Sequence, residues 1–344
     1  MEIRLYVDYI SSMIRKILLT IFAILLVALI AATLFVYVQI KPGGDIDAFS
    51  QYEVNDTGAP SDSQVKVTFF GVSTLLLDDG ETQILIDGFF SRPPVLQALF
   101  KEVESDTVVI DQIVTDYHMD RVKGVFVTHS HYDHGFDVAY VTRRTGATLY
   151  GSLSTLNIGR GGNVPENQLE LYQPYEDIQI GKFSIRVIPT IHSPDNALKD
   201  DGVLIEAPLS QPAKIEAYSE GGSFDFYIQH NGHTIFIKPS PNYEEGVLDT
   251  LQADVVMLGI ATVVQRGDEW KENYYQYTIG VLNPETVIPL HWDNFLKPVS
   301  NHLEMLPRFG NKKGNEDFEF FISRTQADGI DFKILQGMGS VILF

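Results

Sequence analysis

One short stretch of the chain concentrates side chains that bind metals. Residues 126–144 read FVTHSHYDHGFDVAYVTRR and hold three of the nine histidines in the pattern H-x-H-x-D-H. The His and Asp frequencies of the chain predict about one accidental match in roughly two thousand chains of this length. The pattern therefore indicates a metal site rather than a polar loop with incidental histidines.

The position of these residues favours the same interpretation. Residues 124–128 read as a short apolar buried strand, and the histidines begin where it ends. His129 and His131 project to one side, whereas Asp133 and His134 follow a turn and face a neighbouring point before a helix at about 137–144. Imidazoles beside a carboxylate are typical of a two-metal hydrolytic site. Such a site suits Zn²⁺, one or two ions, with Mn or Fe as alternatives.

The motif THSHYDH after an apolar strand resembles the signature of the metallo-β-lactamase superfamily of metal-dependent hydrolases. The resemblance covers about residues 65–344. It implies an α/β (α+β) fold, a four-layer αββα sandwich. Further family motifs follow in the expected order: QILIDGFF places Asp87, VIPTIHSPDN places His192 and TVIPLHWDNF places His291 at strand ends. The resemblance implies that His192 completes the first metal site and that His291 completes the second.

One motif departs from the family pattern. The family usually has an aspartate that bridges the two metals, and the corresponding stretch here is TIFIKPSPNY, with Ser240 in that place. A neutral hydroxyl is a much weaker ligand for a divalent cation than a carboxylate. The second metal is therefore expected to bind more weakly, or the bridge to pass to water or to another group.

These residues predict a hydrolase that uses a metal-bound hydroxide on an ester, lactone or phosphodiester. Asp133 is expected either to bind the second metal or, without that ion, to act as a proton shuttle, and Asp87 to orient a ligand histidine. The motifs HSHYDH and HWD resemble the lactonase-like and N-acyl-phosphatidylethanolamine phospholipase D-like branches. The alternative is a metal-binding member with redox or little catalytic activity, because of Ser240.

Composition limits the remaining possibilities. The 344 residues are 44% hydrophobic and 20% charged, which is ordinary globular material, and residues 65–344 are expected to form one domain. The formal charge of -20 argues against nucleic acid as a partner. The expected partner is a small-molecule or lipid-like substrate. Because the chain has no cysteine, a zinc site must use His, Asp and water.

The N-terminal region contains an uncharged run at residues 17–40. At about 1.5 Å per residue a helix of this length reaches roughly 36 Å, enough to cross the hydrocarbon core of a bilayer. A secretory signal and a buried core helix are the alternatives. The run is longer than the apolar core of a secretory signal, and it is apolar on every face, whereas a core helix usually has one apolar stripe. Arg15 and Lys16 precede it, which favours a cytoplasmic N-terminus (residues 1–16) and an extracytoplasmic catalytic domain. We therefore predict a single-pass membrane anchor.

Two other segments need an interpretation. Residues 41–64 are rich in Gly, Asp, Ser and Pro and are predicted to be a linker. Residues 92–120 show helical spacing of apolar residues, typical of packing helices, although a lid over the metals is an alternative. Arg92 is expected at the surface, with a phosphate or carboxylate as its alternative partner. His230 and His233 flank Asn-Gly and are expected in a hairpin turn rather than as ligands.

Overall fold

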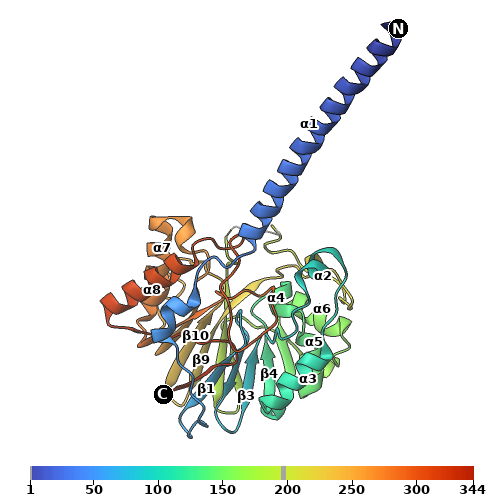
Figure 1. The fold of residues 1–344 in the computed structure, drawn as a ribbon. Helices are drawn as coiled ribbons and strands as arrows, with labels where there is room; N and C mark the ends of the chain where they lie inside the picture. The colour runs from blue at the N-terminus through green and yellow to red at the C-terminus, as the bar shows by residue number, and fades with distance from the viewer. Residues whose placement is uncertain (1, 195–198) are drawn as a thin grey trace.

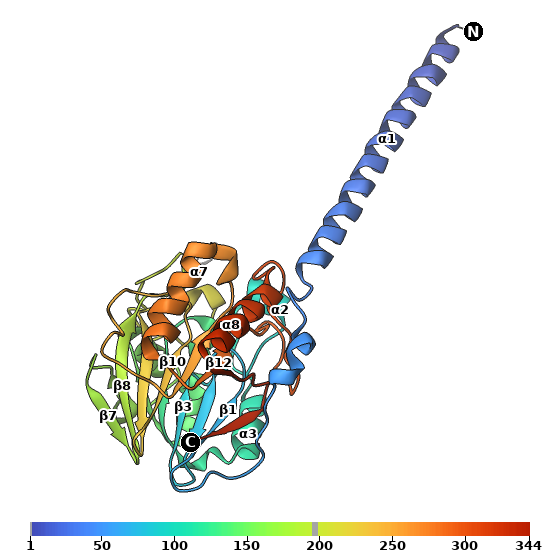
Figure 2. The same cartoon turned by 90° about the vertical axis from the view of Figure 1, so that its left-hand side faces the viewer.

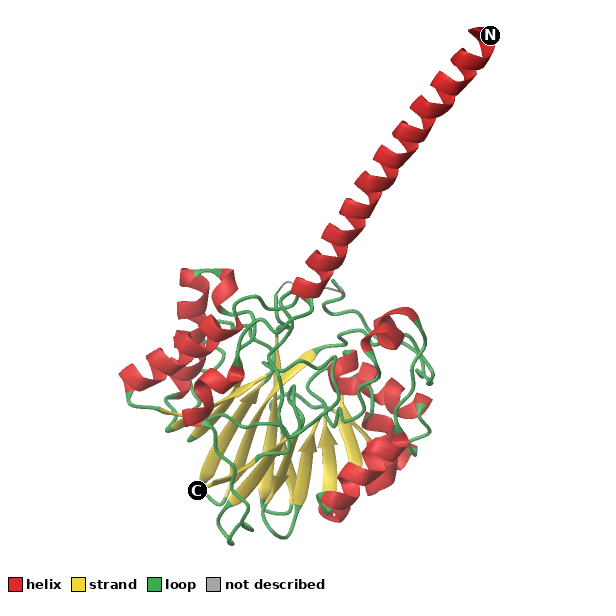
Figure 3. Ribbon diagram, viewed as in Figure 1, coloured by secondary structure: helices red, strands yellow, loops and turns green. Residues whose placement is uncertain are grey.

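The computed structural model describes residues 2–194 and 199–344. Two mixed seven-stranded sheets lie face to face between two layers of helices (Figure 1; Figure 3). Helices α7 and α8 cover one sheet, and helices α3, α5 and α6 lie against the other (Figure 1). The predicted αββα sandwich is confirmed. The helices of the domain are α2 (Val95–Phe100), α3 (Thr107–Asp116), α4 (Tyr132–Gly135), α5 (Val138–Thr145), α6 (Leu153–Gly161), α7 (Asp268–Tyr275) and α8 (Gly314–Asp328).

The first sheet has the strand order β14-β1-β2-β3-β4-β5-β6. Its strands are β1 (Val65–Phe69), β2 (Leu75–Asp78), β3 (Gln83–Ile86), β4 (Val122–Phe126), β5 (Thr148–Gly151), β6 (Leu169–Leu171) and β14 (Ser340–Leu343). The pairs β3–β4, β4–β5 and β5–β6 are parallel. The C-terminal ends of β3 and β4 therefore lie at the same edge of this sheet.

The second sheet has the order β13-β12-β11-β10-β9-β8-β7. Its strands are β7 (Asp177–Ile180), β8 (Phe183–Thr190), β9 (Ser223–His230), β10 (His233–Lys238), β11 (Val255–Gly259), β12 (Thr286–Leu290) and β13 (Asp331–Phe332). Strands β10 to β13 pair in parallel. Because β9 is antiparallel to both β8 and β10, strands β8, β10 and β12 all end at one edge. His230 and His233 pair across the β9–β10 turn, as expected for a hairpin.

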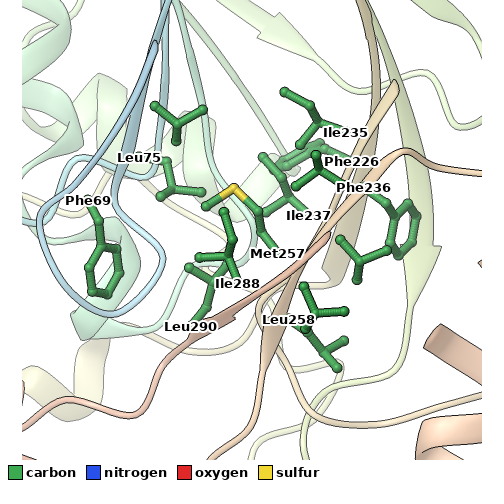
Figure 4. Packing of buried hydrophobic residues seen from close by; sticks show 14 of the residues in the cluster. Phe69, Leu75, Phe226, Ile235, Phe236, Ile237, Met257, Leu258, Ile288 and Leu290 are labelled. Carbon is green, nitrogen blue, oxygen red and sulfur yellow. The ribbon is translucent and has the colours of Figure 1, made fainter. Parts of the chain in front are cut away.

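The main hydrophobic core lies between the sheets (Figure 4). Side chains alternate across each strand. In β3, Ile84 and Ile86 face this core, whereas Leu85 faces a second core under the helix layer that contains α3, α5 and α6. Figure 4 shows Phe69 and Leu75 of the first sheet opposite Met257 and Ile288 of the second. Because these strands are buried on both faces, their sequences are continuously apolar.

Residues 92–120 form α2 and α3, which is the predicted helix pair. Helix α3 packs through Ile110, Ile113 and Val114 against the core of its layer, whereas only Ala98 of α2 is buried. A cavity of about 920 Å³ lies beside these helices, and no ligand candidate lines it. Packing, rather than closure over the ligand residues, therefore accounts for α3.

The long helix α1 (Glu2–Gln39) projects from one edge of the domain (Figure 1; Figure 2). It begins earlier than the predicted run at residues 17–40, because residues 2–16 continue the same helix. Within residues 6–39 the most apolar stretch of 18 residues has a mean hydropathy of 3.0, and no residue of this stretch is buried. A buried core helix, one alternative for this segment, is therefore excluded.

The structure corrects the prediction that residues 41–64 are a linker throughout. Residues 46–52 form a 3-10 helix, and its Ile46 and Phe49 are buried in the main hydrophobic cluster, which also includes residues of α8. Phe49 stacks on Phe318 of α8 with ring centroids 5.1 Å apart. These apolar residues are too few and too irregularly spaced to show periodicity, and Phe318, the ring partner of Phe49, lies 269 positions later in the chain. The segment therefore attaches the helix α1 to the domain.

We expect Phe49→Ala to lower the free energy of unfolding of the full chain by about 3 kcal/mol, because a buried aromatic ring leaves a cavity. Thermal or denaturant unfolding of the detergent-solubilised protein measures the change. Ser50→Ala, at an exposed position of the same short helix, is the matched control. Equal stability of the two variants would show that this segment contributes little to the core.

Candidate metal centre

Four strand ends bring the predicted site residues together. Asp87 follows β3, the H-x-H-x-D-H stretch follows β4, His192 follows β8 and His291 follows β12. Two groups of ligand atoms result, each with all of its atoms within 4.8 Å of one another. The first group is His129, His131 and His192; the second is Asp133, His134 and His291. This grouping is the one that the sequence predicted.

The first group consists of three imidazoles that surround one point. The ring centroids of His129, His131 and His192 lie 4.7 to 4.8 Å apart in every pair. Each pair is tilted edge to face, at 64° to 84°, so the rings are not stacked on one another. Three convergent imidazoles are the ligand set of a catalytic zinc site that keeps a further position open.

The second group combines a carboxylate with two imidazoles. Asp133 Oδ2 lies 3.6 Å from His134 Nε2 and 3.3 Å from His291 Nε2. His134 is fully buried, and its Nε2 has no hydrogen-bond partner among the described residues. An unpaired buried nitrogen that faces a carboxylate and a second imidazole fits a metal ligand. The rings of His129 and His134 are 3.9 Å apart, so the two groups are neighbours.

Asp87 lies behind His134 and does not belong to either group. Its Oδ2 accepts a hydrogen bond from His134 Nδ1 at 2.8 Å. Its other contacts are with Thr128, whose backbone N–H and hydroxyl both donate to Oδ1, and with Ser73, whose hydroxyl donates to Oδ2. A proton on Nδ1 leaves Nε2 of the same ring free to bind a metal. This geometry is the one expected for a carboxylate that orients a ligand histidine.

Asp200 is a residue that the sequence did not reveal. Its two carboxylate oxygens lie 3.1 and 3.3 Å from His131 Nε2. With the proton on Nε2 directed to Asp200, Nδ1 is the nitrogen of His131 that remains available to a metal. The stretch ALKDDGV around Asp200 carries no motif, and the contact joins residues that are 69 positions apart.

Burial and neighbouring charges adjust the protonation of both groups. Burial, together with His134 and His192, keeps the pKa of His129 well below its usual value. Burial and His131 lower the pKa of His192 to about 4. For Asp133 burial alone would raise the pKa, but His134 and His291 outweigh it and hold the pKa below its usual range. Neutral imidazoles and an ionised carboxylate are the forms that bind a divalent cation.

A buried ion pair supports the loop that follows His291. Arg92 and Asp293 have fully buried side chains, and their Nη1 and Oδ2 atoms lie 3.0 Å apart. Arg92 was expected at the surface, and this expectation is wrong. Its partner Asp293 follows β12, 201 positions later in the chain, so Arg92 pairs with a carboxylate of the protein itself. A Cβ at Gly71 would lie 2.2 Å from the guanidinium, so the ion pair requires glycine there.

The backbone is constrained at the same place. Val72, Asp87 and His291 have positive φ values of 54°, 58° and 56°. A positive φ in a β-branched residue is unusual and persists only where surrounding contacts hold it. The N–H of Val72 donates to Asp293 Oδ1 at 2.6 Å, and its carbonyl accepts from the N–H of His291 at 2.8 Å. These contacts set the direction in which His291 leaves β12.

Ser240 follows β10 and is buried. Asn242, two residues later, donates from Nδ2 to the carbonyl of His192 at 2.6 Å, so this segment lies beside the first group. Asp293 and Asp195 are two carboxylates near predicted ligand histidines in the sequence that could replace the missing bridge. Asp293 is committed to Arg92 and Val72, and Asp195 lies outside the described residues.

Comparisons with known proteins agree with this geometry. A model of the metallo-β-lactamase superfamily matches residues 67–212. A UPF0173 metal-dependent hydrolase of Heliobacterium modesticaldum is 25% identical over 229 residues, which cover 67% of this chain and 83% of that protein. A UPF0173 metal-dependent hydrolase of Pyrobaculum islandicum is 24% identical over 235 residues, covering 67% and 85%.

Solved structures with the same fold include a possible metal-dependent hydrolase from Veillonella parvula, with a TM-score of 0.53 and 14% identity over 81% of this chain and all of the other. An isothiocyanate hydrolase from Delia radicum gut bacteria has a TM-score of 0.52 and 17% identity, covering 81% of this chain and 99% of that chain. At such identities the likeness concerns the fold alone. The family match over residues 67–212 shows that this part of the chain is similar to the metallo-β-lactamase superfamily, and the curated relatives are similar proteins named metal-dependent hydrolases.

Proposed function

We propose that the chain is a metal-dependent hydrolase whose reaction centre consists of the two ligand groups at the strand ends. The observation that carries this proposal is the convergence of six imidazole and carboxylate side chains into two adjacent sets. The curated relatives are named metal-dependent hydrolases, which agrees with it. A redox role is not proposed, because Ser240 is the only feature that favoured it.

The proposed metal is zinc, with manganese or iron as alternatives. His129, His131 and His192 would hold the first ion, and Asp133, His134 and His291 the second. A divalent cation bound there polarises a substrate oxygen and lowers the pKa of water. The five histidines and one aspartate fit such ions, since they offer nitrogen and oxygen donors without a thiolate.

Two carboxylates have distinct proposed roles. Asp133, whose side chain is 15% exposed, would bind the second ion or, without that ion, would act as the proton shuttle. Asp87 is completely buried behind His134 and acts as a positioning residue. The proposed substrates are esters, lactones or phosphodiesters, small or lipid-like.

We further propose that α1 is a membrane anchor with the N-terminus in the cytoplasm and the catalytic domain outside. Its apolar surface is exposed along its length, and a helix of this kind is stable only in an apolar environment. Tyr37 and Lys41 lie together at the domain end, with Nζ 4.6 Å from the ring centroid. Such residues are typical of a membrane–water interface.

We expect His131→Ala to lose bound metal and hydrolytic activity together, with kcat/KM at least about 100-fold lower, because the first group loses one of three ligands. Elemental analysis and a panel of aryl esters, lactones and phosphodiesters provide the measurements. Circular dichroism should remain unchanged. His233→Ala, in the β9–β10 hairpin, is the control. Undiminished hydrolysis in His131→Ala would refute the assignment of the centre.

The replacement of the usual bridging aspartate by Ser240 predicts an unequal metal load. We expect close to one ion per chain after dialysis and a rise toward two in Ser240→Asp, because a carboxylate offsets the repulsion between two cations. The variant should be less stable in chelator and recover with zinc or manganese, since a buried carboxylate is costly without a cation. Ser240→Ala should retain the wild-type ratio. Two tightly held ions in the wild type would mean that another group forms the bridge.

The proposed orientation predicts that protease added to intact cells or spheroplasts digests residues 65–344. Immunoblots against the domain before and after membrane permeabilisation measure this accessibility. A cytoplasmic protein of the same cells serves as the control for leakage. Full protection of the domain until the membrane is opened would reverse the orientation.

A further inference from the structure

The end of α1 is joined directly to the edge of the domain that holds the ligand groups. The N–H of Phe309 donates to the carbonyl of Gln39 at 3.1 Å, and the N–H of Arg308 donates to the carbonyl of Lys41 at 2.9 Å. The N–H of Leu306 bonds to the carbonyl of Trp292, the residue after His291. Figure 1 shows α1 leaving the domain at the edge where α4 lies. A membrane that contains α1 therefore faces this edge.

A cavity of about 720 Å³ lies at this junction. Its lining includes the end of α1, the segment after β8, the start of α7 with the residues before it, and the segment 308–312, namely Gln39, Pro194, Gln265, Arg266, Trp270, Arg308, Phe309, Gly310 and Lys312. Three of these residues are cationic, and none of the described lining residues is acidic. The chain as a whole has 45 acidic and 25 basic residues, so the described lining of the cavity is positively charged whereas the whole protein is negatively charged. The cavity is suited to an anion.

Arg266 forms a rigid part of this cavity. Its guanidinium donates to the carbonyl of Pro241 and to the hydroxyls of Ser193 and Thr262, at 2.6 to 2.8 Å. The guanidinium also lies 4.4 Å from the centroid of the Trp270 ring. These contacts hold the positive charge and the indole in place before any ligand arrives, which lowers the entropy cost of binding.

Arg308 and Lys312 are the two solvent-exposed cationic side chains of the cavity. Within the described parts of the chain neither forms an ion pair. Neighbouring lysines differ: Lys297 pairs with Glu304, and Lys313 pairs with Glu316. The two cations at the cavity are thus the ones available to an external anion.

We propose that this cavity binds the anionic headgroup of a membrane phospholipid, an inference that rests on the proposed membrane anchor. The headgroup phosphate lies between Arg308 and Lys312, and the acyl chains follow the apolar surface of α1 into the bilayer. Phe309 is 59% exposed beside the cations, and aromatic side chains with cations are typical of the interface. Because Arg266 contacts Ser193, next to His192, a bound lipid fixes the ligand loop relative to the bilayer.

The test compares lipids retained by the full chain. The detergent-purified protein is mixed with equal amounts of phosphatidylglycerol and phosphatidylcholine, and native mass spectrometry counts the lipids that remain bound. We expect the wild type to retain phosphatidylglycerol preferentially and Arg308→Gln/Lys312→Gln to lose about 10- to 30-fold of this preference. The matched control is Lys123→Gln/Lys214→Gln, which removes two exposed cations elsewhere. If both double variants lose the phosphatidylglycerol preference equally, the preference depends only on the net charge of the protein, and the proposed site is refuted.

Two further experiments distinguish a lipid ligand from free phosphate and test the membrane anchor. Retention that survives millimolar inorganic phosphate supports a lipid ligand, whereas complete displacement would identify a site for free phosphate and overturn the proposal. Carbonate extraction of membranes tests the anchor: a wild type that resists extraction but shows no lipid preference refutes the cavity alone. Release by carbonate refutes the anchor and the lipid site together. Metal content is unaffected by either result, so the hydrolase proposal is tested separately.

Discussion

The direction of the strands is the constraint on which the candidate centre depends. In each sheet the strands that carry ligand residues end at one edge, and the two edges face each other across the core. Side chains from four segments, spread over more than 200 positions, thereby converge without any long excursion of the chain. The apolar core between the sheets fixes the separation of these strand ends, because buried side chains on both faces leave little freedom for one sheet to slide on the other.

Strand direction alone does not set the positions of the ligand atoms. Asp87 fixes the ring of His134, Asp200 fixes that of His131, and the Arg92–Asp293 pair supports the turn that presents His291. Asp87, Arg92 and Asp293 are fully buried and Asp200 is partly buried, and each is hydrogen-bonded, so removing one would leave another polar group unsatisfied. The positive φ values at Asp87 and His291 belong to the same arrangement. Local strain is tolerated there because the surrounding contacts determine the conformation.

The sequence predicted the parts of the structure that depend on local patterns. The apolar strand before the H-x-H-x-D-H stretch located four of the six candidate ligand residues, and the family resemblance supplied His192, His291 and the fold. Features that depend on distant partners were missed. Asp200 lies in a stretch without a motif, Arg92 finds its carboxylate 201 positions later, and Phe49 packs on Phe318. Each is a single polar or apolar residue in an aperiodic segment, and only the folded chain shows what it contacts.

The packing of residues 46–52 limits how α1, the proposed anchor, can move relative to the domain. A flexible linker would let the domain turn freely, so that its reaction centre would face the membrane only part of the time. Here Ile46 and Phe49 are in the core, and backbone hydrogen bonds join Gln39 and Lys41 to the loop after His291. The direction of α1 and the position of the ligand loops are therefore coupled through a short covalent and hydrogen-bonded path. If α1 is the proposed anchor, the strand-end edge with the two residue groups faces the bilayer surface.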